Sequence, residues 1–135
     1  LCSVPWLMLW LLLLAPWTFA QVAVPSPNPE MVAKANSLRS HLDAAHAKLS
    51  VAQYDAAIEE ADKAMQGSER APEILQVRAE AFNLQSIAHY AAGRYLKAID
   101  AAYLGTLEKY DYAPLHRNRA KAYMARREYD KAIHS

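Results

Sequence analysis

A short pattern that recurs along the chain constrains its fold more than any other feature. The pattern is a tyrosine followed by alanine three positions later and isoleucine four positions later, and it begins at Tyr54, Tyr95 and Tyr129. The second and third copies lie 34 residues apart. Repeats of this length fold as similar units that bury their apolar faces by stacking on one another. The chain is therefore expected to form a row of similar units.

Each unit is predicted to consist of helices. From about residue 31 onward the only prolines are Pro72 and Pro114. Each stands at the start of a predicted helix, where the backbone N–H that proline lacks would have no partner within the helix. No persistent alternation of apolar and polar residues predicts a strand, and the 27 alanines favour closely packed helices. The sequence thus predicts an all-α fold of antiparallel helices joined by short loops. The predicted helices are 32–50, 53–66, 72–92, 94–109, 113–126 and 128 to the end.

The spacing and the paired helices resemble the tetratricopeptide repeat (TPR) family. When the three tyrosines are aligned, the units begin near Leu38, Ala79 and Ala113, and positions eight and twenty of each unit carry small residues. These small residues are Ala45, Ser86, Ala120, Ala57, Ala98 and Ala132. The resemblance implies an α-solenoid of about three units, the last one truncated, in which the small residues let the two helices of a unit pack closely. The alternative is an irregular helical bundle.

The repeat departs from the family pattern in several places. The first two units start 41 residues apart, and we attribute the seven extra residues to a lengthened helix from Pro72 to Ala92. Gly105 stands where the family has alanine. The third unit stops at Ser135, inside its second helix, so we expect the natural protein to continue and this chain to be a fragment.

The beginning of the chain differs in composition from the rest. Residues 1–20 are almost entirely apolar, and no charged residue precedes Glu30. A stretch this short, interrupted by prolines, is marginal for crossing a hydrocarbon core of about 30 Å, so we interpret it as a leader helix that acts as a signal peptide cleaved after Ala20. Residues 21–31, with prolines at alternate positions, are predicted to be an extended linker. The protein is therefore expected to be exported, periplasmic or secreted, with a membrane-anchored protein as the alternative.

The sequence offers no catalytic or metal-binding motif. It contains no His-Glu-x-x-His sequence, paired cysteines, glycine-rich phosphate loop or serine nucleophile elbow. His41 and His46 are five positions apart, which places them on different sides of a helix. Glu59, Glu60 and Asp62 are interpreted as a solvated face, since an acid/base pair needs a pocket that perturbs its pKa values. We predict no enzyme activity, cofactor or metal, and the net charge of +1 predicts no nucleic-acid partner.

The resemblance implies that the first helix of each unit lines a concave peptide-binding groove. The predicted groove residues are Arg39, Asp43, His46, Asn83, Ile87, Tyr90, Arg117, Asn118 and Lys121, with Leu84 and Met124 as further apolar members. Residues 113–135 carry six Lys and Arg against two Asp and Glu, a net charge of +4. An acidic partner segment is therefore one prediction, and ordinary surface charge is the alternative. Asn83 and Ile87 occupy the places where the carboxylate-clamp subclass has lysine and asparagine, so binding of a chaperone tail is not predicted.

These observations predict a non-catalytic scaffold that binds a peptide or protein through its concave face. Two alternatives remain open. The repeats are the accessory or docking part of a larger enzyme whose catalytic domain follows residue 135, or they form a membrane-tethered assembly scaffold that keeps residues 1–20 as its anchor. A membrane is a partner only if that leader is not cleaved.

Overall fold

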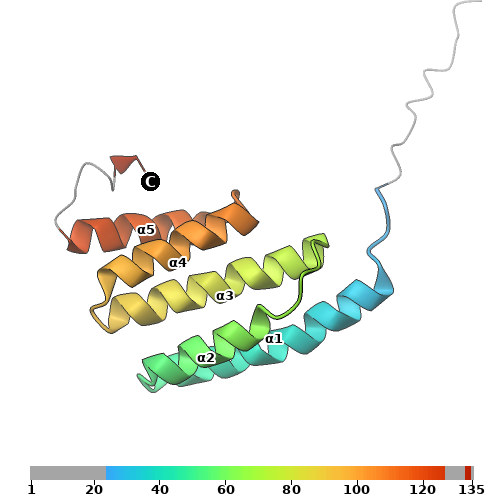
Figure 1. Cartoon of the computed structure of the whole chain (residues 1–135), viewed down its shortest axis with the longest axis horizontal. Helices are drawn as coiled ribbons and strands as arrows, with labels where there is room; N and C mark the ends of the chain where they lie inside the picture. Colours follow the sequence, from blue (N-terminus) through green and yellow to red (C-terminus); the bar gives the residue numbers. More distant parts are fainter. Residues whose placement is uncertain (1–23, 127–132, 135) are drawn as a thin grey trace, which may run out of the picture.

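Five α-helices follow one another in the part of the chain that the structure describes (Figure 1). The structure, a computed structural model, describes residues 24–126 and 133–134. The helices are α1 (Pro29–Ser50), α2 (Tyr54–Ala64), α3 (Pro72–Ala91), α4 (Tyr95–Glu108) and α5 (Ala113–Ala125). No strand occurs in the described residues, so the predicted all-α class is confirmed, as are the first five predicted helices. Most of the predicted sixth helix, including Tyr129, lies outside the described residues.

The first helix begins earlier than the sequence pattern predicts. α1 starts at Pro29, so three residues assigned to the linker are helical. The side-chain oxygen of Asn28 accepts a hydrogen bond from the Glu30 N–H at 2.9 Å and caps the helix, and proline fits the first turn because its missing N–H is not needed there. The leader of residues 1–20 lies outside the described residues. In the described part of the chain, no helix is both long and apolar enough to span a membrane.

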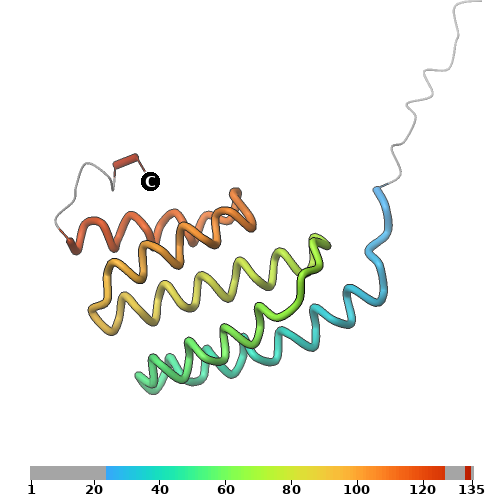
Figure 2. Tube along the Cα trace, in the orientation of Figure 1, coloured from blue at the N-terminus to red at the C-terminus, as the bar shows by residue number. Residues whose placement is uncertain are grey.

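α3 lies at the centre of the helix arrangement. It packs against each of the other four helices, whereas α1 and α2 contact neither α4 nor α5. The chain trace in Figure 2 shows α1, α3 and α5 running in one direction and α2 and α4 in the other. Three-residue turns join α1 to α2 and α3 to α4, so each of these pairs is an antiparallel hairpin. The fold therefore consists of two stacked hairpins with α5 packed on the second.

Two sides of α3 are buried by this arrangement. The side towards α1 and α2 carries four residues that are at most 1% exposed, Ile74, Val77, Ala81 and Leu84. On the side towards α4 and α5, Ala79 and Phe82 pack with Ala102 and Leu115. A helix that is apolar on more than one side is stable only when it is enclosed by others. α3 therefore joins the two halves of the core.

The turns after α1 and α3 have the same backbone geometry. Ala52 and Gly93 both have positive φ, 58° and 74° respectively. Each of the two donates its N–H to the carbonyl three positions earlier, and the residue after each donates to the carbonyl five positions earlier. This is the hydrogen-bond pattern of a Schellman helix end. Ala52 and Gly93 are 41 positions apart, like Tyr54 and Tyr95, so the backbone repeats with the spacing of the sequence pattern.

The small residues predicted to let paired helices approach are buried in the first two units. Ser86 Oγ donates a hydrogen bond to the Ala98 carbonyl oxygen at 2.8 Å, and both residues are 0% exposed. Ala45 and Ala57, at the same positions of the first unit, are also buried. In the third unit Ala120 is half-buried, and its predicted partner lies outside the described residues.

Gly105 lies where α4 closely approaches α3 and α5. A Cβ atom built on this glycine would lie 2.7 Å from both methyl carbons of Leu115 and 2.8 Å from Phe82 Cβ. Carbon atoms in contact are normally about 3.5–4.0 Å apart. Glycine at this position therefore permits a closer packing than alanine would.

Gly105→Ala is expected to destabilise the protein by about 1–2 kcal/mol, because overpacking of a core outweighs the higher helix propensity of alanine. The midpoint of urea unfolding measures the change. Asp100→Ala, at an exposed position of the same helix, is the control and should change the free energy of unfolding by less than about 0.5 kcal/mol. A Gly105→Ala variant as stable as the parent would contradict the close approach.

Ala52→Gly is expected to raise the free energy of unfolding by about 0.5–1 kcal/mol, because the Cβ of alanine is strained at positive φ and glycine has none. Thermal unfolding is the measurement. Ala92→Gly is the matched control. Ala92 is the C-cap residue of α3 and has φ −80°, so glycine there relieves no strain and this variant should lose stability. Changes of the same sign in both variants would show that the turn at Ala52 is not strained.

Candidate functional site

One strip of the α3 surface lies outside the two sides that pack into the core and stays partly exposed. Its five residues follow each other at intervals of three or four positions, Gln76, Glu80, Asn83, Ile87 and Tyr90. Ile87 is 37% exposed and the other four are half-buried. This spacing follows one face of an α-helix. The three groove residues predicted on α3, Asn83, Ile87 and Tyr90, therefore share one face.

α5 brings two further predicted groove residues against this strip. Asn118 and Lys121 line, together with Ile87 and Tyr90, a depression of about 40 Å³, which we call the α3–α5 depression. Small-molecule sites usually measure at least roughly 300 Å³. The depression is therefore the size of one small chemical group, such as a methyl-bearing side chain, and far smaller than an organic cofactor.

Two side-chain amides pair beside the depression. Asn118 Nδ2 donates a hydrogen bond to Asn83 Oδ1 at 2.7 Å, across residues that are both half-buried. A carboxamide has two N–H donors and one carbonyl acceptor, so the pair keeps both N–H groups of Asn83, the second N–H of Asn118 and the carbonyl oxygen of Asn118 for further partners. Turning both amides over leaves the same kinds of group, N–H donors and a carbonyl oxygen, side by side.

Positive charge lies next to the amide pair. Lys121 Nζ lies 5.2 Å from the centre of the Tyr90 ring, within the range of a cation–π interaction. Arg117, one turn earlier on α5, is exposed. Neither cation belongs to any of the ion pairs found in the described part of the chain. Lys121 therefore places at the depression a cation that has no ion-pair partner among the described residues, and Arg117 lies one turn away on α5.

The predicted groove residues of α1 do not join the depression. Arg39 Nη1 lies 3.7 Å from Glu80 Oε2, so Arg39 is directed to the other end of the α3 strip. Asp43 and His46 are exposed on α1. Glu80 also accepts a hydrogen bond from Gln76 Nε2 at 2.7 Å. The repeat alignment places Glu80 at position two of the second unit, the same position as Arg39 in the first. This shared position could have identified Glu80 as a groove residue beside Arg39.

The two additional apolar candidates have different environments. Leu84 is 1% exposed and belongs to the core between α1, α2 and α3, which corrects its predicted place in the groove. Met124 is 52% exposed on α5 and is not among the residues that line the α3–α5 depression. The wall of the depression is therefore formed by Ile87 and Tyr90.

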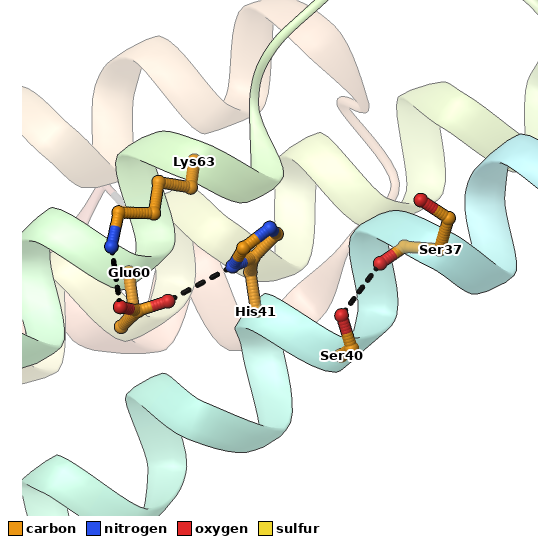
Figure 3. A network of polar contacts seen from close by, with 5 residues as sticks. All are labelled: Ser37, Ser40, His41, Glu60 and Lys63. Atoms are coloured by element: carbon orange, nitrogen blue, oxygen red, sulfur yellow. Dashed lines mark hydrogen bonds and ion pairs between the residues drawn. The ribbon is translucent and has the colours of Figure 1, made fainter.

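Glu60 of α2 forms ion pairs at the surface. Figure 3 shows Glu60 between His41 of α1 and Lys63 of its own helix. Glu60 Oε2 lies 2.9 Å from His41 Nδ1, and Lys63 Nζ donates to Glu60 Oε1 at 2.6 Å. The hydrogen bond from Lys63, and secondly that from His41, hold the pKa of Glu60 below its usual value. Ser40 Oγ, nearby on α1, bonds the Ser37 carbonyl oxygen of its own helix at 2.7 Å.

The same network ties α1 to α2, and it sets a pH dependence. Because the pKa of Glu60 is lowered by folding, its stabilising effect is present above the unfolded-state value of 4.5 and is lost as the pH falls through the lower folded-state value. Glu60→Gln should therefore lower the melting temperature at pH 7 and approach the parent as the pH falls below 4.5.

Melting temperatures between about pH 3 and 7 measure this effect, over the range where carboxylates titrate. Glu59→Gln is the control, because Glu59 is exposed on the same helix and forms no ion pair within the described residues. It should retain the pH profile of the parent. Identical profiles for the Glu60→Gln variant and the parent would exclude a contribution of the network to acid sensitivity.

No family model, curated protein or solved structure matches the chain. Within the described residues, no three His, Cys, Asp or Glu side chains gather in a group that could hold a metal ion. The α3–α5 depression, with its amide pair and Lys121, is the arrangement from which we argue a function.

Proposed function

We propose that the helices form an α-solenoid of TPR-like hairpins and that this solenoid is a non-catalytic interaction domain that binds an extended peptide segment of another protein. The observation that carries the proposal is the Asn83–Asn118 pair, which presents N–H donors and a carbonyl acceptor next to the α3–α5 depression. The repeated turn geometry after α1 and α3 supports the repeat assignment.

The chemistry of the depression matches a short stretch of polypeptide. A peptide group offers one N–H and one carbonyl oxygen, which complement the acceptor and the donor left on the two amides. A neighbouring apolar side chain of the peptide fills the depression against Ile87 and Tyr90. A carboxylate further along reaches Lys121 and Arg117, and the planar guanidinium of Arg117 suits a carboxylate or a phosphate.

Such contacts add up to a weak interaction. Each net hydrogen bond contributes about 0.5–1.5 kcal/mol, and each exposed ion pair contributes about 1 kcal/mol or less. A dissociation constant of 1 μM corresponds to about 8 kcal/mol. We therefore propose binding in the micromolar range or weaker for a single peptide, with acidic segments preferred.

The cellular location of the protein is proposed from residues 1–20 alone. The apolar residues 1–20 favour export, with a membrane-tethered scaffold as the second candidate. A docking role within a larger enzyme is compatible with the same depression, because binding of a substrate segment uses the same contacts.

Arg117→Ala/Lys121→Ala is expected to weaken the binding of acidic peptides by about tenfold, which corresponds to about 1.4 kcal/mol from two exposed charges. Peptides are selected from a random library against the full chain, and their affinities for the parent and the variant are compared. Asn83→Ala/Asn118→Ala should instead weaken acidic and neutral peptides alike, because it removes contacts to the peptide backbone.

Lys48→Ala/Arg70→Ala is the control, since it removes the same charge from two exposed positions outside the depression. It should bind the selected peptides like the parent. An acidic preference that survives the Arg117→Ala/Lys121→Ala change, or a parent without any such preference, would refute the role of these cations. Peptide binding that is unaffected by Asn83→Ala/Asn118→Ala would refute the site itself.

A further inference from the structure

The aromatic wall of the α3–α5 depression is held in place by contacts outside α3. The centre of the Tyr90 ring lies 5.3 Å from that of the Tyr95 ring, and the two planes are tilted by 57°. Tyr90 also packs against a cluster of buried residues, Ala98, Ile99 and Ala122. These residues belong to α4 and α5. The ring therefore cannot turn away from the depression without losing contacts to both helices.

The other walls of the depression differ in how they are held. Asn118 is oriented by its hydrogen bond to Asn83. Lys121 is exposed, and its ammonium group lies 5.2 Å from the centre of the Tyr90 ring. Ile87, 37% exposed, is the one aliphatic member of the α3 strip. An aliphatic side chain makes no directional contact, so Ile87 acts on the depression through its volume.

The space between these walls limits what can enter. The depression has a volume of about 40 Å³, and a cavity needs about 10–15 Å³ to hold one water molecule. It therefore accommodates about three non-hydrogen atoms, the size of a valine side chain. Alanine would leave part of the space empty and lose contacts with its walls. Leucine and phenylalanine would exceed the space and would have to displace a wall.

We propose that the α3–α5 depression selects its peptide by side-chain size, that it takes valine or the equally shaped threonine, and that Ile87 sets this limit. The proposal rests on the proposed function, because it names the segment that the same site binds. Ile87 and Tyr90 contact the methyl groups of the bound side chain. A hydroxyl in place of one methyl is tolerated, since the carbonyl oxygen of Asn118 accepts a hydrogen bond from it and an apolar pocket rejects such an isostere only weakly.

Shortening Ile87 should change the preferred side chain. Ile87→Ala removes about as many non-hydrogen atoms as the depression accommodates, so the enlarged space takes leucine or phenylalanine and leaves valine loosely packed. The variant should fold, because Ile87 is 37% exposed and alanine is the better helix former. Its melting temperature checks this. An inverted order of affinities is a signature that a general loss of stability does not produce.

The probe is the tightest-binding peptide selected from the random library, labelled with a fluorophore at its N-terminus and amidated at its C-terminus. Each position is replaced in turn by alanine, valine, leucine and phenylalanine, and fluorescence anisotropy with the full chain measures each dissociation constant. In the parent, one position should bind valine about tenfold more tightly than alanine and several-fold more tightly than the two larger residues. In Ile87→Ala, leucine should bind there several-fold more tightly than valine.

A control variant and a direct contact complete the test. Val51→Ala shortens another exposed aliphatic side chain, 62% exposed and outside the depression, and should keep the order of the parent. Nuclear Overhauser effects between the methyl groups of the peptide valine and the ring protons of Tyr90 should place that side chain in the depression.

The outcomes separate this proposal from the proposed function. A parent that binds the peptide but nowhere prefers valine to leucine and phenylalanine would overturn the size limit and leave peptide binding intact. So would an Ile87→Ala variant that keeps the order of the parent, or a bound valine without contact to Tyr90. A parent that binds no peptide from the library would overturn the proposed function, and the size limit with it.

Discussion

The burial of α3 on two sides is the constraint on which the other features of the fold depend. Four helices can reach one central helix because small residues occupy much of its surface, and Ala79, Ala81, Ser86 and Ala88 are all 0% exposed. Close approach matters because dispersion attraction falls off within about an ångström of the optimal separation. Gly105 extends the same principle to α4, where a single added carbon would overlap Phe82 and Leu115. α3 thereby fixes the two hairpins relative to each other, and loosening either side would loosen both.

The same constraint creates the candidate site. With two sides of α3 used for the core, the remaining strip stays half-exposed and can carry polar residues without a desolvation cost. One part of the strip reaches α1, where Glu80 meets Arg39, and the other reaches α5, where Asn83 meets Asn118. The depression at Ile87 and Tyr90 lies where it does because α5 packs directly on α3. Its position is a consequence of helix packing, and no local motif encodes it.

Local chemistry was enough to predict the helices. Pro72 and Pro114 lie in first turns, and Gly93 adopts the positive φ of a helix end. The start of α1 could not be predicted from alternate prolines alone, because a capping side chain on Asn28 converts the last of them into a first helical residue. The pairing of side chains was also out of reach, since Asn83 and Asn118 are 35 positions apart and meet only through the crossing of two helices. The repeat alignment predicted the shared face, but it could not show that Asp43 and His46 on α1 lie apart from the depression.

Some cations of the described residues are paired between elements, and others lie at the surface without an ion-pair partner. Between elements of the framework, cations are paired, as in Arg78–Glu108 at 2.9 Å and Arg94–Asp55 at 2.7 Å. Arg117, Lys121 and Lys97 take no part in the ion pairs of the described residues. Because exposed ion pairs add at most about 1 kcal/mol to stability, folding alone neither requires nor forbids these charges.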